Sequence, residues 1–183
     1  EIASKQIMDY SGEKPLTYQC DISNKEALFK FLDEASSNLG SVDILVNNAG
    51  GPPPGNLMDL ESSSFEAAHK LTFMSSVHST KYVVPYMLKK NWGRIIFLSS
   101  TGVKSIVEGL LLSNTYRGAV AGFAKSVSVE FGSQGVKVHN ILSGPFETER
   151  VVELGGKASK EKGISYGTWK KEAEANTLLG RFG

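Results

Sequence analysis

Three short, nearly continuous apolar segments, separated by amphipathic stretches, constrain the fold of this chain more than any other feature. They lie at residues 42–46, 94–99 and 136–142. Their apolar character is typical of strands buried on both faces of a parallel sheet, because a strand with one face in water alternates polar and apolar residues. The intervening stretches have the apolar spacing of helices. The pattern therefore predicts an α/β fold, a doubly wound parallel sheet with helices on both faces.

The remaining elements follow from the same periodicity and from capping residues. They are predicted as helices at 1–10, 25–38, 63–90 and 113–131 and as a short strand at 16–20. Ser23 or Asn24 can cap the second of these helices, and Pro85 would kink the third. Residues 151–183 are polar and weakly periodic, and they are predicted as a mobile helical segment that covers a substrate site.

Composition excludes several classes of function. The 183 residues have room for one domain, and a net charge of +1 gives no electrostatic case for binding nucleic acid or an anionic membrane. The single cysteine, Cys20, excludes an intrachain disulfide framework and a cysteine-based zinc site. No apolar run is long enough to cross a bilayer. We expect a soluble, cytoplasmic protein with a small-molecule substrate and no metal.

Ligands of parallel α/β sheets bind at the carboxyl ends of the strands. The loops that follow the predicted strands are therefore the candidate site. They are Asp21-Ile22, residues 48–55, residues 99–109 and residues 143–148.

These loops resemble those of the short-chain dehydrogenase/reductase family, and within it the 3-oxoacyl-acyl-carrier-protein reductase-like members. Order and spacing fit without an insertion from Asp21 to Thr148. The stretch Asp43 to Gly50 is a specific signal, whereas the family usually has Pro-Gly where this chain has Ser143-Gly144. The residues that carry the resemblance are Asp21-Ile22, Asp43 to Gly50, Pro85, Gly93 to Ile96, Ser99-Ser100, Asn140 and Ser143 to Thr148.

The resemblance implies that the domain is Rossmann-like and incomplete in residues 1–183. The family's first βαβ unit, with its glycine-rich phosphate turn, is expected before residue 1, and a last strand after Gly183. In the strand order 3-2-1-4-5-6, residues 16–20 would be strand 3 and residues 42–46 strand 4. These two strands are therefore expected not to pair with each other.

The resemblance also implies NAD or NADP as cofactor. The residue that distinguishes the two lies outside this chain, so both remain open. An Asp that caps a helix, an ordinary tight turn and an ordinary loop are the structural alternatives for the cofactor residues. The implied contacts are Asp21 and Ile22 with the adenine, Asn48, Ala49, Gly50 and Arg117 with ribose, and Phe146 and Thr148 with the nicotinamide amide.

The family's catalytic set is Asn, Ser, Tyr and Lys, and this chain matches one of the four. Ser100 stands at the serine position, or is a plain strand-end serine. Ser113 and Arg117 stand at the tyrosine and lysine positions, and Thr72 at the asparagine position. A serine is not a tunable acid near neutral pH, and Arg117 can stabilise an oxyanion but keeps its protons.

Tyr116 is the candidate substitute for the missing tyrosine. It is one residue from Arg117 and about 100° round a helix from it, so we expect it to pack rather than react. A helix that begins late, near Thr115, would let Tyr116 swing toward Ser100.

Two hypotheses follow. The first is an oxidoreductase of the short-chain dehydrogenase/reductase type that uses NAD or NADP on a carbonyl or an alcohol. The second is a non-catalytic subunit of the same fold that binds a dinucleotide or pairs with a catalytic partner. Under either hypothesis the resemblance implies a homodimer or homotetramer formed through the helices at 63–90 and 113–131.

Overall fold

The computed structural model describes residues 2–183. The chain divides into two compact units, the first ending at Ile141 and the second running from Leu142 to Gly183. The second unit thus begins at Leu142, whereas the mobile segment was predicted to begin at residue 151. No helix of residues 2–183 is long and apolar enough to cross a membrane.

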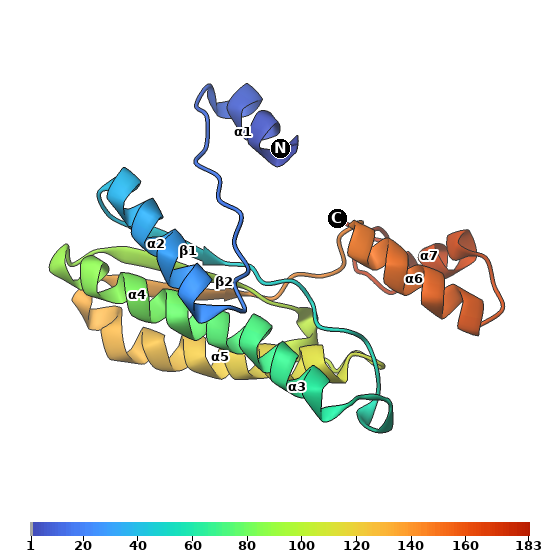
Figure 1. Cartoon of the computed structure of the whole chain (residues 1–183). Helices are drawn as coiled ribbons and strands as arrows, with labels where there is room; N and C mark the ends of the chain where they lie inside the picture. The colour runs from blue at the N-terminus through green and yellow to red at the C-terminus, as the bar shows by residue number, and fades with distance from the viewer. Residues whose placement is uncertain (1) are drawn as a thin grey trace. The chain divides into compact units, whose positions relative to one another are not determined.

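A three-stranded parallel sheet forms the centre of the first unit (Figure 1). Its strands are β1 (Ile44–Asn47), β2 (Gly93–Leu98) and β3 (Val136–Ile141), in the order β1-β2-β3. Asn47 pairs with Phe97 and Phe97 with Asn140, so these three residues form one row near the carboxyl edge of the sheet. The predicted α/β fold with a parallel sheet is confirmed.

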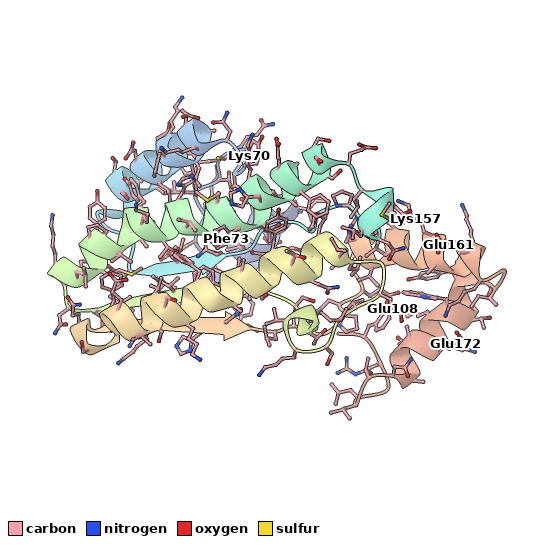
Figure 2. The ribbon with its side chains drawn as sticks, turned by 90° about the horizontal axis from the view of Figure 1, so that it is seen from below. Lys70, Phe73, Glu108, Lys157, Glu161 and Glu172 are labelled. Atoms are coloured by element: carbon pink, nitrogen blue, oxygen red, sulfur yellow. The ribbon has the colours of Figure 1, made fainter. Side chains whose placement is uncertain are left out.

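Helices α4 (Ser75–Lys89) and α5 (Leu111–Phe131) lie side by side against one face of this sheet (Figures 1 and 2), and α2 (Lys25–Leu39) packs on α4. The strand order never reverses, and right-handed crossovers then place successive helices on the same face. The core between helices and sheet contains Val83, Val84, Met87, Ile95, Phe97, Val120, Ala124, Val127 and Val136.

Within the described part of the first unit, residues 2–141, no helix covers the opposite face of the sheet. Ile44, Val46 and Ile141 are exposed to 57%, 51% and 47%. The predicted helices on both faces are therefore found on one face only. A helix on the second face needs a strand order that turns back, and none of the strands described here provides such a reversal.

The segment before α2 contains helix α1 (Ile2–Ser11), which ends one residue later than predicted. Residue 1 of the predicted helix lies outside the described residues. Residues 16–20 do not form the predicted strand, because no strand of residues 2–183 offers them main-chain hydrogen bonds. Because residues 16–20 form no strand, the predicted separation of two strands from each other is not tested. Asn24 caps α2 by accepting a hydrogen bond from Ala27 N at 2.9 Å.

The long helix predicted at 63–90 is interrupted, but not at Pro85. It consists of α3 (Ser62–Ala68), a π-helical turn η2 (His69–Met74) and α4, which contains Pro85. Single π turns are frequent at functional sites. Three short 3-10 turns complete the first unit: η1 (Leu57–Asp59), η3 (Thr101–Val103) and η4 (Gly132–Gln134).

The second unit consists of α6 (Glu149–Glu161) and α7 (Tyr166–Ala175) around Trp169. The indole stacks on Tyr166, with ring centroids 5.6 Å apart, and meets Phe182 edge-on at 6.3 Å. Gly183 N donates to Pro145 O at 3.1 Å, which joins the two ends of the unit. The predicted helical character of this region is confirmed, and its mobility stays a prediction.

Candidate functional site

The carboxyl edge of the sheet brings together the loops that follow β1 and β2. Gly55 and Leu110 form an isolated parallel bridge between these loops. Gly55 N donates to Gly109 O at 2.7 Å, and Leu111 N donates to Gly55 O at 3.4 Å. The loop with the predicted cofactor residues and the loop with Ser100 are therefore tied to each other just before α5 begins.

Arg117 links the ends of β1 and β2. Its Nη1 donates to Leu98 O at 3.1 Å and its Nη2 to Ala49 O at 3.3 Å. Burial lowers the pKa of the guanidinium group, but an arginine stays protonated in proteins. A positive charge is thus fixed at the carboxyl edge, in contact with the predicted cofactor turn.

A small pocket of about 10 Å³ lies beside this guanidinium group. Its size and polar lining suit a single water molecule. Thr72, in the π turn, is 2% exposed. Its hydroxyl group and the Nδ2 group of Asn47 are buried and have no hydrogen-bond partner among residues 2–183. The lining residues are Asn47, Ala49, Thr72, Ser76, Phe97, Leu98, Ser99, Arg117 and Val120.

Ser100 and Ser113 are not among the residues that line this pocket. Ser100 precedes η3, and its Oγ accepts a hydrogen bond from Gly102 N at 3.1 Å. The hydroxyl proton of Ser100 is therefore left to donate. Ser113 is half-buried in the first turn of α5, one helical turn before Arg117 and on the same helix face. A common cleft of Ser100, Ser113 and Arg117 stays a prediction.

Tyr116 packs against the π turn. Its ring centroid lies 5.9 Å from that of His69, which in turn lies 5.7 Å from Phe73. Phe73, labelled in Figure 2, also meets Phe123 of α5 edge-on. Because α5 begins at Leu111, the alternative of a late helix start near Thr115 is wrong.

Asp21 lines a larger pocket, of about 440 Å³. Its Oδ1 accepts hydrogen bonds from the hydroxyl of Ser23 at 2.7 Å and from Ser23 N at 2.9 Å. These bonds lower the pKa of the exposed carboxyl group, which is therefore ionised at neutral pH. The walls are contributed by Asp21, Ser23, Gly51, Pro52, Pro53, Ser63, Glu66, Ala67, Ala68, Lys70 and Leu71.

The predicted cofactor residues are thus distributed over three places. Asp21 borders the larger pocket and Ala49 the smaller one, whereas Ile22, Asn48 and Gly50 line neither. Phe146 and Thr148 belong to the second unit, where Thr148 precedes α6. Their predicted contact with the nicotinamide amide stays a prediction.

The sequence analysis assigned no site role to Asn47, which lies in the stretch Asp43 to Gly50, or to Asn114. The side chain of Asn47 lies at the end of β1, with its Oδ1 2.6 Å from Ser79 Oγ, and Asn114 binds the loop after β2. Both are asparagines, one at the end of a strand and one in the first turn of a helix, where a short carboxamide often binds nearby main-chain groups. This placement could have indicated them from the sequence. Among residues 2–183 no group of three or more metal-binding side chains is placed to hold a metal ion.

The sequence matches the family model described as short chain dehydrogenase over residues 1–158. It is 29% identical over 138 residues to 7alpha-hydroxysteroid dehydrogenase of Escherichia coli K12, covering 75% of this chain and 54% of that protein. It is 28% identical over 150 residues to the 3-oxoacyl-acyl-carrier-protein reductase of Buchnera aphidicola, covering 82% and 62%. The chain therefore spans between 54% and 62% of the length of these two relatives.

Solved structures show the same fold. A variant of actinorhodin polyketide ketoreductase solved with NADPH superposes with a TM-score of 0.92 at 23% identity, covering 100% of this chain and 70% of that one. L-sorbose reductase of Gluconobacter frateurii, complexed with NADPH and L-sorbose, gives a TM-score of 0.89 at 21% identity, covering 99% and 69%. The expected Rossmann-like arrangement is therefore confirmed.

Proposed function

Because the chain belongs to the short-chain dehydrogenase/reductase family, we propose that the protein is an NAD(P)-dependent oxidoreductase that reduces a carbonyl group or oxidises an alcohol. A 3-oxoacyl-acyl-carrier-protein reductase-like substrate is the finer form of this proposal. The observation that carries it is the half-buried charge of Arg117, held at the carboxyl edge of the sheet by Ala49 O and Leu98 O. Support also comes from the relatives named above, which are dehydrogenases and reductases.

The described residues fit a dinucleotide. An ionised carboxylate at Asp21 borders a pocket whose walls include the apolar side chains of Pro52 and Leu71. Such a pocket suits a flat purine ring whose exocyclic amine donates to the carboxylate. We assign Asp21 and Ile22 to the adenine. The remaining assignments are Asn48, Ala49, Gly50 and Arg117 to ribose, and Phe146 and Thr148 to the nicotinamide amide.

When bound, a nicotinamide cofactor supplies or accepts the hydride. In carbonyl reduction, Ser100 orients the carbonyl oxygen with its free hydroxyl proton, and Arg117 stabilises the developing alkoxide with its charge. Ser113 adds a hydroxyl on the same helix face as Arg117. The proton for the alkoxide comes from solvent water, and the hydroxide ion that remains is neutralised by the buffer, because no side chain of the proposed site is an acid near neutral pH and Tyr116 packs against His69.

The test is made on the full-length protein. NADH or NADPH is titrated in, and cofactor oxidation is followed by absorbance with a panel of carbonyl compounds. Turnover slower than that of an enzyme with a tyrosine acid by roughly 10²–10⁴-fold is expected. Arg117→Ala is expected to weaken cofactor binding and turnover together, whereas Tyr116→Phe is expected to leave both unchanged.

Arg94→Ala is the matched control for Arg117→Ala, because Arg94 Nη1 also donates to main-chain carbonyl oxygens, those of Gly93 and Gly135, at the opposite end of β2. It should not weaken cofactor binding. If Arg117→Ala binds the cofactor as the wild type does, the assignment of Arg117 is wrong. If neither NADH nor NADPH binds, the proposal as a whole is wrong.

One observation favours a second candidate function, a non-catalytic dinucleotide-binding subunit. Two of the five N–H donors of Arg117 are already engaged by main-chain carbonyl oxygens, and Ser113 occupies the position of the acid. Tight cofactor binding without turnover of any carbonyl or alcohol would favour this reading over the oxidoreductase.

A further inference from the structure

The loop that carries Ser100 is held by one side chain of α5. Asn114 Nδ2 donates to Val107 O at 2.8 Å, and Asn114 Oδ1 accepts from Val107 N at 3.4 Å. The carboxamide thus binds both main-chain polar groups of one loop residue. This pattern orients the amide, because the donor faces a carbonyl oxygen and the acceptor faces an N–H group.

The same carboxamide also lies against Gly102. A β carbon built on Gly102 would stand 2.6 Å from Asn114 Oδ1, so a side chain at this position would displace the carboxamide. Gly102 is buried, and its N–H donates to Ser100 Oγ at 3.1 Å. Asn114, Gly102 and Ser100 therefore form a continuous chain of contacts from α5 to the predicted catalytic hydroxyl.

We infer that Asn114 is a positioning residue for Ser100: by holding Val107 and Gly102 it fixes the N–H group on which the Ser100 hydroxyl rests. This inference rests on the proposed oxidoreductase function. With one lone pair of Oγ bound to Gly102 N, the hydroxyl proton of Ser100 is directed away from the loop and can donate to a substrate carbonyl. A displaced Gly102 releases the hydroxyl to rotate, and misplacement of about 1 Å can cost about 10²-fold in rate.

The test is a double-mutant cycle on the full-length enzyme with Ser100→Ala, Asn114→Ala and the pair. Asn114→Ala alone is expected to lower kcat by up to about 10²-fold while the Kd for NADPH or NADH changes little. In the Ser100→Ala background the same substitution is expected to cost less than about twofold. A merely structural residue would lower the rate equally in both backgrounds, because independent effects add as free energies.

Asn38→Ala is the matched control. Asn38 Nδ2 donates to Glu34 O at 2.8 Å and to Tyr18 OH at 2.9 Å within and beside α2, away from the Ser100 loop. It should leave kcat unchanged. A second arm uses Gly102→Ala, whose new methyl group would meet Asn114 Oδ1; Asn114→Ala should restore part of the rate lost in that variant by making room.

The outcomes separate the inference from the proposed function. If Ser100→Ala itself leaves kcat unchanged, the proposed role of Ser100 is wrong. If Ser100→Ala lowers kcat while Asn114→Ala is silent or strictly additive, the positioning role is overturned. For a preparation without turnover, amide hydrogen exchange decides: faster exchange at Gly102 and Val107 in Asn114→Ala supports the inference, and unchanged exchange overturns it.

Discussion

At the scale of single residues, the proposed site combines a fixed positive charge with hydroxyl groups and lacks a side chain that is acidic near neutral pH. Arg117 brings a permanent charge, Ser113 and Thr72 bring hydroxyl groups, and none of the three is an acid near neutral pH. The structure adds that Arg117 also joins two strands through Ala49 O and Leu98 O. One residue therefore serves both the proposed chemistry and the integrity of the sheet edge.

Replacing Arg117 by Met should destabilise the protein by about 1–3 kcal/mol, because two carbonyl oxygens lose their charged donor and the rest of the side chain is conserved in length. Urea unfolding of both proteins measures the difference. Arg94→Met is the control, because one Arg94 bond goes to its chain neighbour Gly93, at 2.8 Å, and the bond to Gly135 O is long, at 3.4 Å. Since only the longer bond joins distant parts of the chain, a smaller loss is expected. An Arg117→Met protein as stable as wild type would show that the two bonds contribute little.

At the scale of elements, close approach and single polar links decide how helices pack. In the second unit a β carbon at Gly155 of α6 would lie 2.2 Å from the Trp169 ring of α7. In the first unit Tyr82 OH of α4 donates to Asp33 Oδ1 of α2 at 2.6 Å. The packing of α6 on α7 depends on the absence of a side chain at Gly155. The link between α4 and α2 depends on the protonation of the Tyr82 phenol.

Gly155→Ala should destabilise the second unit by about 1–3 kcal/mol, because the added methyl group forces the Trp169 ring to move. The neighbouring Gly156 has nothing within 4 Å of its β-carbon position. Gly156→Ala should therefore stabilise α6 by roughly 0.5–1 kcal/mol through helix propensity alone. Tryptophan fluorescence during urea unfolding reports both, and equal effects of the two substitutions would contradict the packing of α6 on α7.

Tyr82→Phe should change how stability depends on alkaline pH. Burial and the hydrogen bond to Asp33 raise the pKa of Tyr82 from 10.0 to about 12 in the folded protein. The link therefore contributes fully below pH 10, where the phenol is protonated in both states, and its contribution is lost as the pH rises toward 12. Wild type should lose stability more steeply than Tyr82→Phe between these values in urea unfolding at a series of pH. Parallel curves would mean that the phenol does not link α2 to α4.

At the scale of the whole molecule, the sheet presents one covered face and one bare face. Val46 pairs with Ile96, and Leu98 pairs with Ile141, so the apolar side chains of the bare face are neighbours across the strands. An apolar surface of this kind favours association. The covered face, by contrast, is closed by α4 and α5 with residues that are almost fully buried.

The chain of 183 residues should therefore associate in a concentration-dependent way through this face. Val46→Thr combined with Ile141→Thr, which keeps branched side chains in the strands, should reduce association measured by sedimentation velocity. Ile106→Thr serves as control, because Ile106 is 77% exposed in the loop after β2. Association that responds to the control but not to the sheet variant would exclude the bare face as its cause.

Local patterns were sufficient for much of the fold. Apolar segments predicted all three strands to within two residues, and apolar spacing with a cap at Ser23 or Asn24 predicted α2, whose cap is Asn24. The signals for these elements, apolar periodicity and a capping side chain, lie within a few residues, although the hydrogen bonds of the strands join distant segments. The strands in turn predicted that loops 48–50 and 99–100 belong to the candidate site, because the carboxyl ends of parallel strands share one edge of the sheet.

Long-range packing decided the rest. The sequence indicated an unbroken helix with a kink at Pro85, whereas the irregular turn lies at His69–Met74, beside Tyr116. The sequence by itself determined which residue types stand at the edge of the sheet. Only the tertiary structure decided that Arg117 binds Ala49 and Leu98 and that Asn114 binds Val107, because these partners are distant in the chain or across a loop and no local periodicity encodes their contact.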